Sequence, residues 1–289
     1  MNKIKQLTVI SGKGGTGKTS IVGAFAALAE NKVLADCDVD ASDLHLLLHP
    51  RVVEEQEFKA LKKAEIDKSK CVKCGRCVEY CRFDAIEDYA VKSLSCEGCG
   101  VCEYVCPAKA VQLRDNVAGK AFISETRFGP LCHARLNPGE EASGKLVTLV
   151  RNNARKVAKE KRHDLIIIDG SPGIGCPVIA SIGGVDLALV VTEPTLSGIH
   201  DLDRILSVAE HFKVKPLVCI NKYDINRKNT DEIGDYCRKR KFKVVGRIPY
   251  DSVFTIAQIE GKTVIEHSKG IIADNLKGVW DEVNDSLRQ

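Results

Sequence analysis

The residues with the clearest chemistry lie near the start of the chain, where residues 12–19 read Gly-Lys-Gly-Gly-Thr-Gly-Lys-Thr. This octet fits G-x-x-x-x-G-K-[ST], in which glycines admit phosphate oxygens to backbone N–H groups, the lysine neutralises their charge and the hydroxyl binds Mg²⁺. The apolar run 7–10 precedes it and the small-residue run 20–29 follows it, so we expect a strand-to-helix turn. The segment predicts a triphosphate site formed by Gly12, Lys13, Gly14, Gly15, Thr16, Gly17, Lys18, Thr19 and Ser20.

A dinucleotide site is the competing interpretation of the same glycines. Gly12, Gly14 and Gly17 also fit G-x-G-x-x-G, and Asp36 lies near the place of the ribose-binding acid. Such a site needs close helix packing after its third glycine, whereas Lys18 and Thr19 at that place serve a triphosphate and its metal. These two residues therefore favour the triphosphate.

Eight of the 13 cysteines lie between residues 71 and 106, in two runs of the form C-x₂-C-x₂-C-x₃-C. Pro107 follows the second run, whereas Arg82 takes the place of the proline after the first. The doubled run matches the two-cluster bacterial ferredoxin pattern, in which the fourth cysteine of each run ligates the other cluster. The match implies one 4Fe-4S cluster on Cys71, Cys74, Cys77 and Cys106 and a second on Cys96, Cys99, Cys102 and Cys81. Zinc on four cysteines is the alternative, since thiolates also suit zinc.

Size and composition limit the classes of protein to consider. A chain of 289 residues with 44% hydrophobic residues can bury one large core and a small second module. It has no run of about 18 apolar residues and no room for a signal peptide before the first strand, so we expect a cytoplasmic protein without a membrane partner. The net charge is only +4 and aromatic residues make up 5%, so the basic run 238–241 predicts no nucleic-acid partner.

Apolar runs that end in acidic residues predict a parallel sheet beside the nucleotide. Residues 165–168 end at Asp169, as expected of a central strand with a Walker B carboxylate, and residues 33–35 end at Asp36. The fold class that follows is α/β, a mainly parallel-sheet P-loop NTPase with an inserted α+β ferredoxin domain. The expected boundaries are 1–60 for the first part of the ATPase domain, 61–115 for the insertion and 116–289 for the second part.

The additional lysine of the phosphate-binding segment, Lys13, resembles the signature lysine of the MinD, ParA, Mrp and nitrogenase iron protein superfamily. There this lysine reaches the nucleotide of a second subunit, so the resemblance implies a nucleotide-dependent homodimer. The catalytic residues that it implies are Lys13, Lys18, Asp38 and Asp169. The implied magnesium shell lies near Thr19, Asp36 and, again, Asp169. A solvated lysine at position 13, and simple helix capping by Asp40 or Ser42, are the alternatives.

The nucleotide base is expected beside Asn221, Pro249 and Asp251. Residues 221–224 read Asn-Lys-Tyr-Asp, which also spells the N-K-x-D of guanine-specific GTPases. ATP is favoured only by resemblance, because residues 249–251 are similar to the adenine-side loop of MinD-type ATPases. The choice between ATP and GTP therefore stays open at this stage.

Two further features give expectations for the structure. Cys132 precedes Asp169 and Cys176 follows it, at positions similar to those of the cluster-bridging cysteines of the nitrogenase iron protein. This resemblance implies a third 4Fe-4S cluster, shared by two subunits at a dimer interface. Buried, inert cysteines are the alternative. Residues 271–287 predict an amphipathic helix whose acidic polar face favours packing on the core over binding to a membrane.

Three functions are consistent with these features. The leading hypothesis is a MinD-like ATPase that uses Mg²⁺ and ATP and delivers electrons through two 4Fe-4S clusters to a protein partner. The alternatives are an ATP-dependent carrier of iron–sulfur clusters of the Mrp kind, with a cluster-accepting protein as partner, and a positioning or cell-division ATPase of the MinD/ParA kind with redox-sensing clusters.

Overall fold

The computed structural model describes residues 3–140 and 144–289, and in it the chain divides into two compact units. The core unit comprises residues up to Glu55, residues Ala121–Arg135 and the chain from residue 144 onward. The inserted unit comprises Gln56–Lys120 together with residues 136–140. It is longer than the expected insertion, 61–115, because three strands, β3, β8 and β9, have residues in both units.

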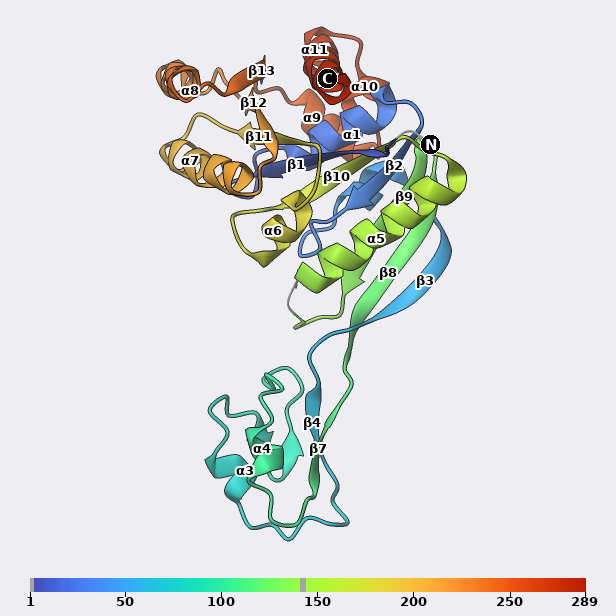
Figure 1. Cartoon of the computed structure of the whole chain (residues 1–289), viewed down its shortest axis with the longest axis vertical. Coiled ribbons are helices and arrows are strands. Elements are labelled where there is room, and N and C mark those ends of the chain that lie inside the picture. Colours follow the sequence, from blue (N-terminus) through green and yellow to red (C-terminus); the bar gives the residue numbers. More distant parts are fainter. Residues whose placement is uncertain (1–2, 141–143) are drawn as a thin grey trace. The chain divides into compact units, whose positions relative to one another are not determined.

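A sheet of nine strands organises the chain, in the order β13-β12-β11-β1-β10-β2-β9-β8-β3 (Figure 1). The strands are β1 (Lys5–Ser11), β2 (Lys32–Asp36), β3 (Arg51–Lys59), β8 (Val117–Thr126), β9 (Gly129–Leu136), β10 (Leu165–Pro172), β11 (Leu187–Thr192), β12 (Lys215–Asn221) and β13 (Lys243–Ile248). All pairings from β13 across to β9 are parallel, with Val9 opposite Asp169 and Asp169 opposite Asp36. The predicted parallel α/β sheet is therefore confirmed.

The central strands are apolar because both faces of the sheet are covered. Every residue of β2 and β11 is buried, as expected of parallel strands between helical layers. One layer contains α1 (Lys18–Leu28), α10 (Val264–His267) and α11 (Ile271–Arg288), which pack together, and α5 (Gly144–Lys161), α6 (Cys176–Ile182) and α7 (Leu196–His211) lie on the other side (Figure 1). The remaining helices of this unit are α2 (Leu44–Leu48), α8 (Arg227–Lys239) and α9 (Val253–Ile259).

The last helix packs on the core, as its acidic polar face predicted. Trp280 of α11 lies with its ring 5.0 Å from that of Phe25 on α1. The buried face of α11 contains Ile272, Leu276, Val279, Trp280, Val283 and Leu287. No helix among the described residues is long and apolar enough to cross a bilayer.

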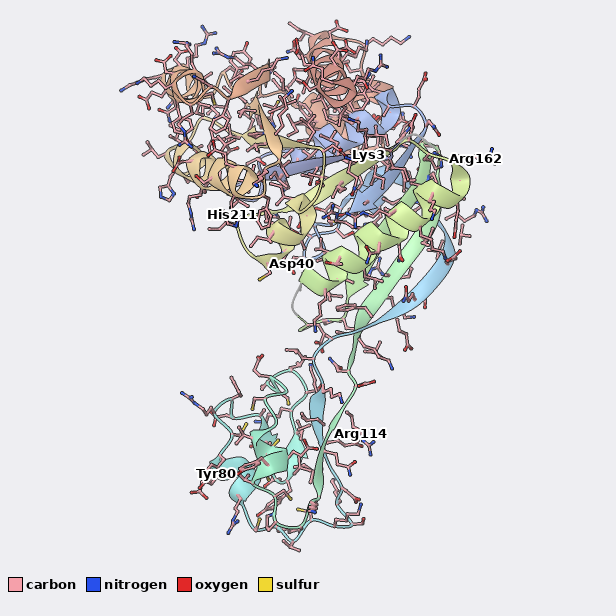
Figure 2. The ribbon with its side chains drawn as sticks, viewed as in Figure 1. Lys3, Asp40, Tyr80, Arg114, Arg162 and His211 are labelled. Atoms are coloured by element: carbon pink, nitrogen blue, oxygen red, sulfur yellow. The ribbon has the colours of Figure 1, made fainter. Side chains whose placement is uncertain are left out.

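The inserted unit is built as a near repeat around its two cysteine runs. Its elements are β4 (Lys63–Ile66), α3 (Arg76–Glu79), β5 (Ile86–Glu87), β6 (Ala90–Val91), α4 (Val101–Tyr104) and β7 (Val111–Arg114). Each short helix begins after a glycine in the left-handed conformation, Gly75 and Gly100, both with φ of 80°. Tyr80, which follows α3, is exposed on the surface of the unit, and Arg114 ends β7, which pairs with β4 (Figure 2).

Candidate functional site

The phosphate-binding segment lies between β1 and α1 and lines an open cavity of about 410 Å³. Gly17 has φ of 91°, and a Cβ added to it would lie 2.4 Å from the side-chain nitrogen of Asn221. A Cβ on Gly12 would lie 2.4 Å from the Cβ of Asp201. The turn can therefore form only with glycine at these two positions. The predicted residues that line the cavity are Gly14, Gly15, Gly17, Lys18, Thr19, Ser20, Asp38, Asn221, Pro249 and Asp251.

Three carboxylates and one lysine meet beside this cavity, at the carboxyl ends of β2 and β10. The Nζ of Lys18 lies 3.6 Å from Oδ2 of Asp38, and both side chains are buried. Burial raises the pKa of Asp38, and the positive charge of Lys18 acts in the opposite direction. Burial raises the pKa of Asp169 to about 7, and Lys18 opposes this shift as well. When the three carboxylates are ionised, they carry more negative charge than Lys18 can neutralise, and a bound cation would balance the remainder.

Asp169 is better suited than Asp36 to be a ligand of magnesium. Both carboxylate oxygens of Asp169 are buried and have no hydrogen-bond partner among the described residues. Mg²⁺ binds through one or two carboxylates while keeping waters and substrate phosphates, so two unpartnered oxygens beside a phosphate site suit it. Asp36 instead accepts hydrogen bonds from the Ser42 hydroxyl (2.8 Å) and from the amides of Asp38 and Leu44, which orders the loop after β2.

The loop after β2 and the end of β10 are also joined by hydrogen bonds. The hydroxyl of Ser171 donates to the carbonyl of Cys37 (2.7 Å), and the amide of Cys37 donates to the carbonyl of Asp169 (2.8 Å). Asp40 and Ser42 do not cap α2, whose N-cap is Asp43 without a side-chain cap bond. The amide of Leu44, the first residue of α2, is instead bound by Asp36.

Lys13 is bound within its own chain. Its Nζ lies 2.6 Å from Oε1 of Glu193 and donates to the hydroxyls of Thr195 (3.0 Å) and Ser197 (3.1 Å). Lys222 contacts the other oxygen of Glu193 at 2.9 Å and also donates to the carbonyl of Gly15. Although burial opposes the change, these two lysines lower the pKa of Glu193. The sequence analysis missed Glu193, although an acid directly after the buried run 187–192 is the same signal that marked Asp36 and Asp169.

The N-K-x-D residues position loops around the base side of the cavity. The side-chain amide of Asn221 donates to the carbonyl of Thr16 (2.8 Å), so it holds the phosphate-binding turn. Asp224 accepts from the amide of Tyr250 at 2.7 Å, and Asp251 accepts from the amide of Val253 at the start of α9. Tyr250, from the segment that resembles an adenine-side loop, also lines this side, and the residues there that the sequence analysis missed are Phe254, Thr255 and Gln258.

The eight clustered cysteines line two cavities in the inserted unit. The first cavity is lined by Cys71, Cys74, Cys77 and Cys106. The second is lined by Cys81, Cys96, Cys99 and Cys102. The structure therefore brings these cysteines together in the two groups that the spacing implied.

The thiols of each group surround a space instead of converging on a point. Zinc needs four sulfurs at about 2.3 Å from one centre. In the part of the chain that the structure describes, no three His, Cys, Asp or Glu side chains are placed to hold one metal ion. Amide donors reach a sulfur in both groups, from Ala85 to Cys81 (3.4 Å) and from Ala110 to Cys106 (3.3 Å). Each group thus offers four sulfur donors and one amide donor to a sulfur, a set that suits thiolate-bound metal.

The two cysteines expected to share a third cluster lie in unlike surroundings. Cys132 is fully buried on β9, where its neighbour across the sheet is Ala35, and burial raises its pKa to about 12. Cys176 is exposed at the start of α6. A thiol within the sheet cannot contribute to a surface site without unpacking β9, so the structure favours the alternative of a buried, inert cysteine for Cys132.

Comparison with known proteins agrees with this nucleotide site. The model of the CobQ/CobB/MinD/ParA nucleotide-binding domain family matches residues 7–264, and the chain belongs to this family. The uncharacterized protein MJ0578 of Methanocaldococcus jannaschii is 34% identical over 98% of both chains. The septum site-determining protein MinD of Bacillus subtilis is 31% identical over 94 residues, covering 32% of this chain and 34% of MinD. In structure, MinD of Pyrococcus horikoshii, solved with Mg-ADP, shares the fold at a TM-score of 0.60 with 17% identity over 97% of this chain and 96% of its own.

Proposed function

We propose that the chain is a Mg²⁺-dependent ATPase whose inserted unit holds two 4Fe-4S clusters, and that ATP turnover controls electron delivery from them to a protein partner. The family and the P-loop geometry support the ATPase. The single observation that carries the redox part is the pair of cavities, each lined by four cysteines. When bound, the clusters would supply one-electron carriers of low potential.

The residues of the core unit would act on the triphosphate by charge and position. Lys18 would neutralise the phosphates, and Thr19 and Asp169 would hold Mg²⁺ through its shell. Asp38, 3.6 Å from Lys18, is the carboxylate placed to orient a water. Because Ser171 and Asp169 of β10 are hydrogen-bonded to Cys37, loss of the γ-phosphate would change the loop after β2 and the turn after β10 together.

Lys13 would complete the site of a second copy of the chain. In the single chain its ammonium is bound to Glu193, away from a role in its own cavity. A nucleotide-dependent homodimer would exchange this internal ion pair for a phosphate of the partner. This is the role that the family resemblance implies for the signature lysine.

The experiment for the redox part is anaerobic reconstitution followed by iron and sulfide analysis. We expect an iron content per chain that corresponds to two four-iron clusters. The variants Cys74→Ser and Cys99→Ser should each contain half of that iron. The control is Cys176→Ser, an exposed cysteine of the core unit, which should keep full iron. Zinc in place of iron, or an equal loss in the control, would contradict the proposal.

Coupling between the two activities is tested with Lys18→Ala. We expect ATP to change the rate at which the reduced protein passes electrons to a dye acceptor, and Lys18→Ala to remove this dependence while iron content stays unchanged. Electron transfer that ignores ATP would contradict the coupling. Movement of intact clusters to an apo-ferredoxin would instead support the carrier function.

A positioning ATPase is the second candidate, favoured by the similarity to MinD in sequence and fold. It would use the ATP cycle to move between places in the cell, and the inserted unit would only sense redox state. Under this function Cys74→Ser and Cys99→Ser would leave localisation of a tagged protein unchanged, whereas Lys18→Ala would abolish its pattern. Loss of ATP-gated electron transfer in the same cysteine variants would favour the redox function.

A further inference from the structure

The two cysteine cavities are alike in the groups that contact sulfur. In each, one cysteine sulfur accepts a backbone amide four residues later, at 3.4 Å for Cys81 and 3.3 Å for Cys106. Each also contains one exposed cysteine, Cys74 in the first and Cys99 in the second. Amide donors and exposed ligands therefore do not distinguish the two sites.

The charged residues in the linings do distinguish them. The cavity of Cys71, Cys74, Cys77 and Cys106, here the basic site, is lined by Lys73 and by no acidic residue. The cavity of Cys81, Cys96, Cys99 and Cys102, here the acidic site, is lined by Glu97 and by no basic residue. Among the described residues neither Lys73 nor Glu97 forms an ion pair, so neither charge is neutralised by a neighbour.

No other Lys, Arg, Asp or Glu side chain among the described residues lines either cavity. Lys70 is paired with Asp67 at 3.2 Å, and Glu103 accepts from the amide of Leu113. Arg82 follows Cys81 in the sequence but does not line either cavity. Lys73 belongs to a fixed segment, because it has a left-handed φ of 55° and its carbonyl accepts from the hydroxyl of Tyr89 at 2.9 Å.

Reduction adds a negative charge to an iron–sulfur cluster, so a nearby cation favours the reduced state and a nearby carboxylate opposes it. We propose that the basic site has the higher reduction potential of the two, so that an electron given to the inserted unit resides there. The inference rests on the proposed cluster binding, and it makes Lys73 and Glu97 the residues that set the order of the two potentials. Because both side chains are exposed, the difference is larger at low salt than at high salt.

The test uses anaerobic redox titration followed by electron paramagnetic resonance. Cys99→Ser leaves the basic site intact and Cys74→Ser leaves the acidic site intact, so each midpoint is assigned to one site. We expect the higher midpoint in Cys99→Ser. Lys73→Gln should lower it while Lys73→Arg keeps it, and Glu97→Gln should raise the midpoint of the acidic site in Cys74→Ser.

The full two-cluster chain gives an independent measurement if the serine variants fold poorly. There Lys73→Gln should lower only the higher midpoint, and Glu97→Gln should raise only the lower one, with both shifts reduced at 1 M salt. Coincident midpoints, a reversed order, or shifts absent from both charge variants would overturn the inference. A chain that takes up no iron contradicts the proposed function instead, and metal analysis identifies that case before any titration.

Discussion

Lys13 and Glu193 form an ion pair of 2.6 Å between the phosphate-binding turn and the end of β11. The same carboxylate also holds Lys222 at 2.9 Å, so one acid restrains two lysines beside the nucleotide cavity. A lysine held in this way must leave Glu193 before it can contact another chain. In the proposed homodimer, association would therefore compete with this contact.

Removing the acid should favour the dimer. Glu193→Gln frees Lys13, and for a pair of about 1 kcal/mol we expect roughly 5-fold tighter association in the presence of a non-hydrolysed ATP analogue. Light scattering after gel filtration measures this. The control is Asp186→Asn, which removes the ion pair with Lys3 (2.7 Å) and should not change association. A weaker dimer in Glu193→Gln would mean that the pair supports the nucleotide-bound state.

Two glycines of the same turn should tolerate alanine differently. Gly17 has a positive φ and lies too close to Asn221 for a Cβ, whereas nothing lies within 4 Å of the position of a Cβ on Gly14. We expect Gly17→Ala to lower the free energy of unfolding by more than about 1 kcal/mol and Gly14→Ala to change it by less than about 0.5 kcal/mol. Denaturant unfolding of the nucleotide-free protein measures both. Equal losses would show that the conformation of this turn is not the limiting factor.

Asp169 should carry the magnesium dependence. Asp169→Asn keeps the shape of the side chain but removes the charge from two buried, unpartnered oxygens. We expect hydrolysis to fall at least about 100-fold, consistent with loss of metal-assisted charge stabilisation, while nucleotide binding in EDTA stays near that of the wild type. Asp36→Asn is the comparison, because Asp36 already accepts three hydrogen bonds within the chain and should lose stability as well as activity.

The N-K-x-D segment should not select guanine. Bidentate recognition of guanine needs both oxygens of the aspartate, but Oδ1 of Asp224 is bound to the amide of Tyr250 at 2.7 Å. We expect tighter binding of ATP than of GTP, and we expect Asp224→Ala to weaken ATP binding several-fold by releasing the loop of Tyr250. Competition with a fluorescent nucleotide gives both affinities. Preferential binding of GTP, lost in Asp224→Ala, would show that the carboxylate turns to read the base.

His133 should make the core unit sensitive to acid. Burial lowers its pKa to about 4, and its ring lies against the Ser124 hydroxyl (3.0 Å) and the ring of Phe122. Between pH 6.5 and 4 the unfolded chain binds a proton that the folded chain does not, so stability falls as the pH is lowered, by up to roughly 3 kcal/mol for this residue. His133→Gln should flatten this slope in urea unfolding. His200→Gln, at an exposed histidine, should leave it unchanged.

The sequence predicts local features of this chain better than distant contacts. The phosphate-binding turn and the parallel sheet follow from short patterns, because glycine conformation is local and a continuous apolar run is typical of a buried parallel strand. The contact of Lys13 with Glu193 joins residues 180 positions apart, and no pattern around Lys13 indicates it. The burial of Cys132 likewise depends on β9 pairing with β2, which is a property of the whole sheet. The grouping of eight cysteines agrees with their spacing, whereas cluster binding stays a prediction.

The order of strands at one edge of the sheet has an evolutionary consequence. The chain leaves toward the cysteine-bearing segment after β3 and returns through β8, and these two strands are neighbours in the sheet. If the segment were absent, a short turn could join β3 directly to β8 at little entropic cost. The segment could therefore be gained or lost without changing the order of the strands. Loss of the segment would remove none of β1, β2 and β10, the strands that precede the phosphate-binding turn and that contain Asp36 and Asp169.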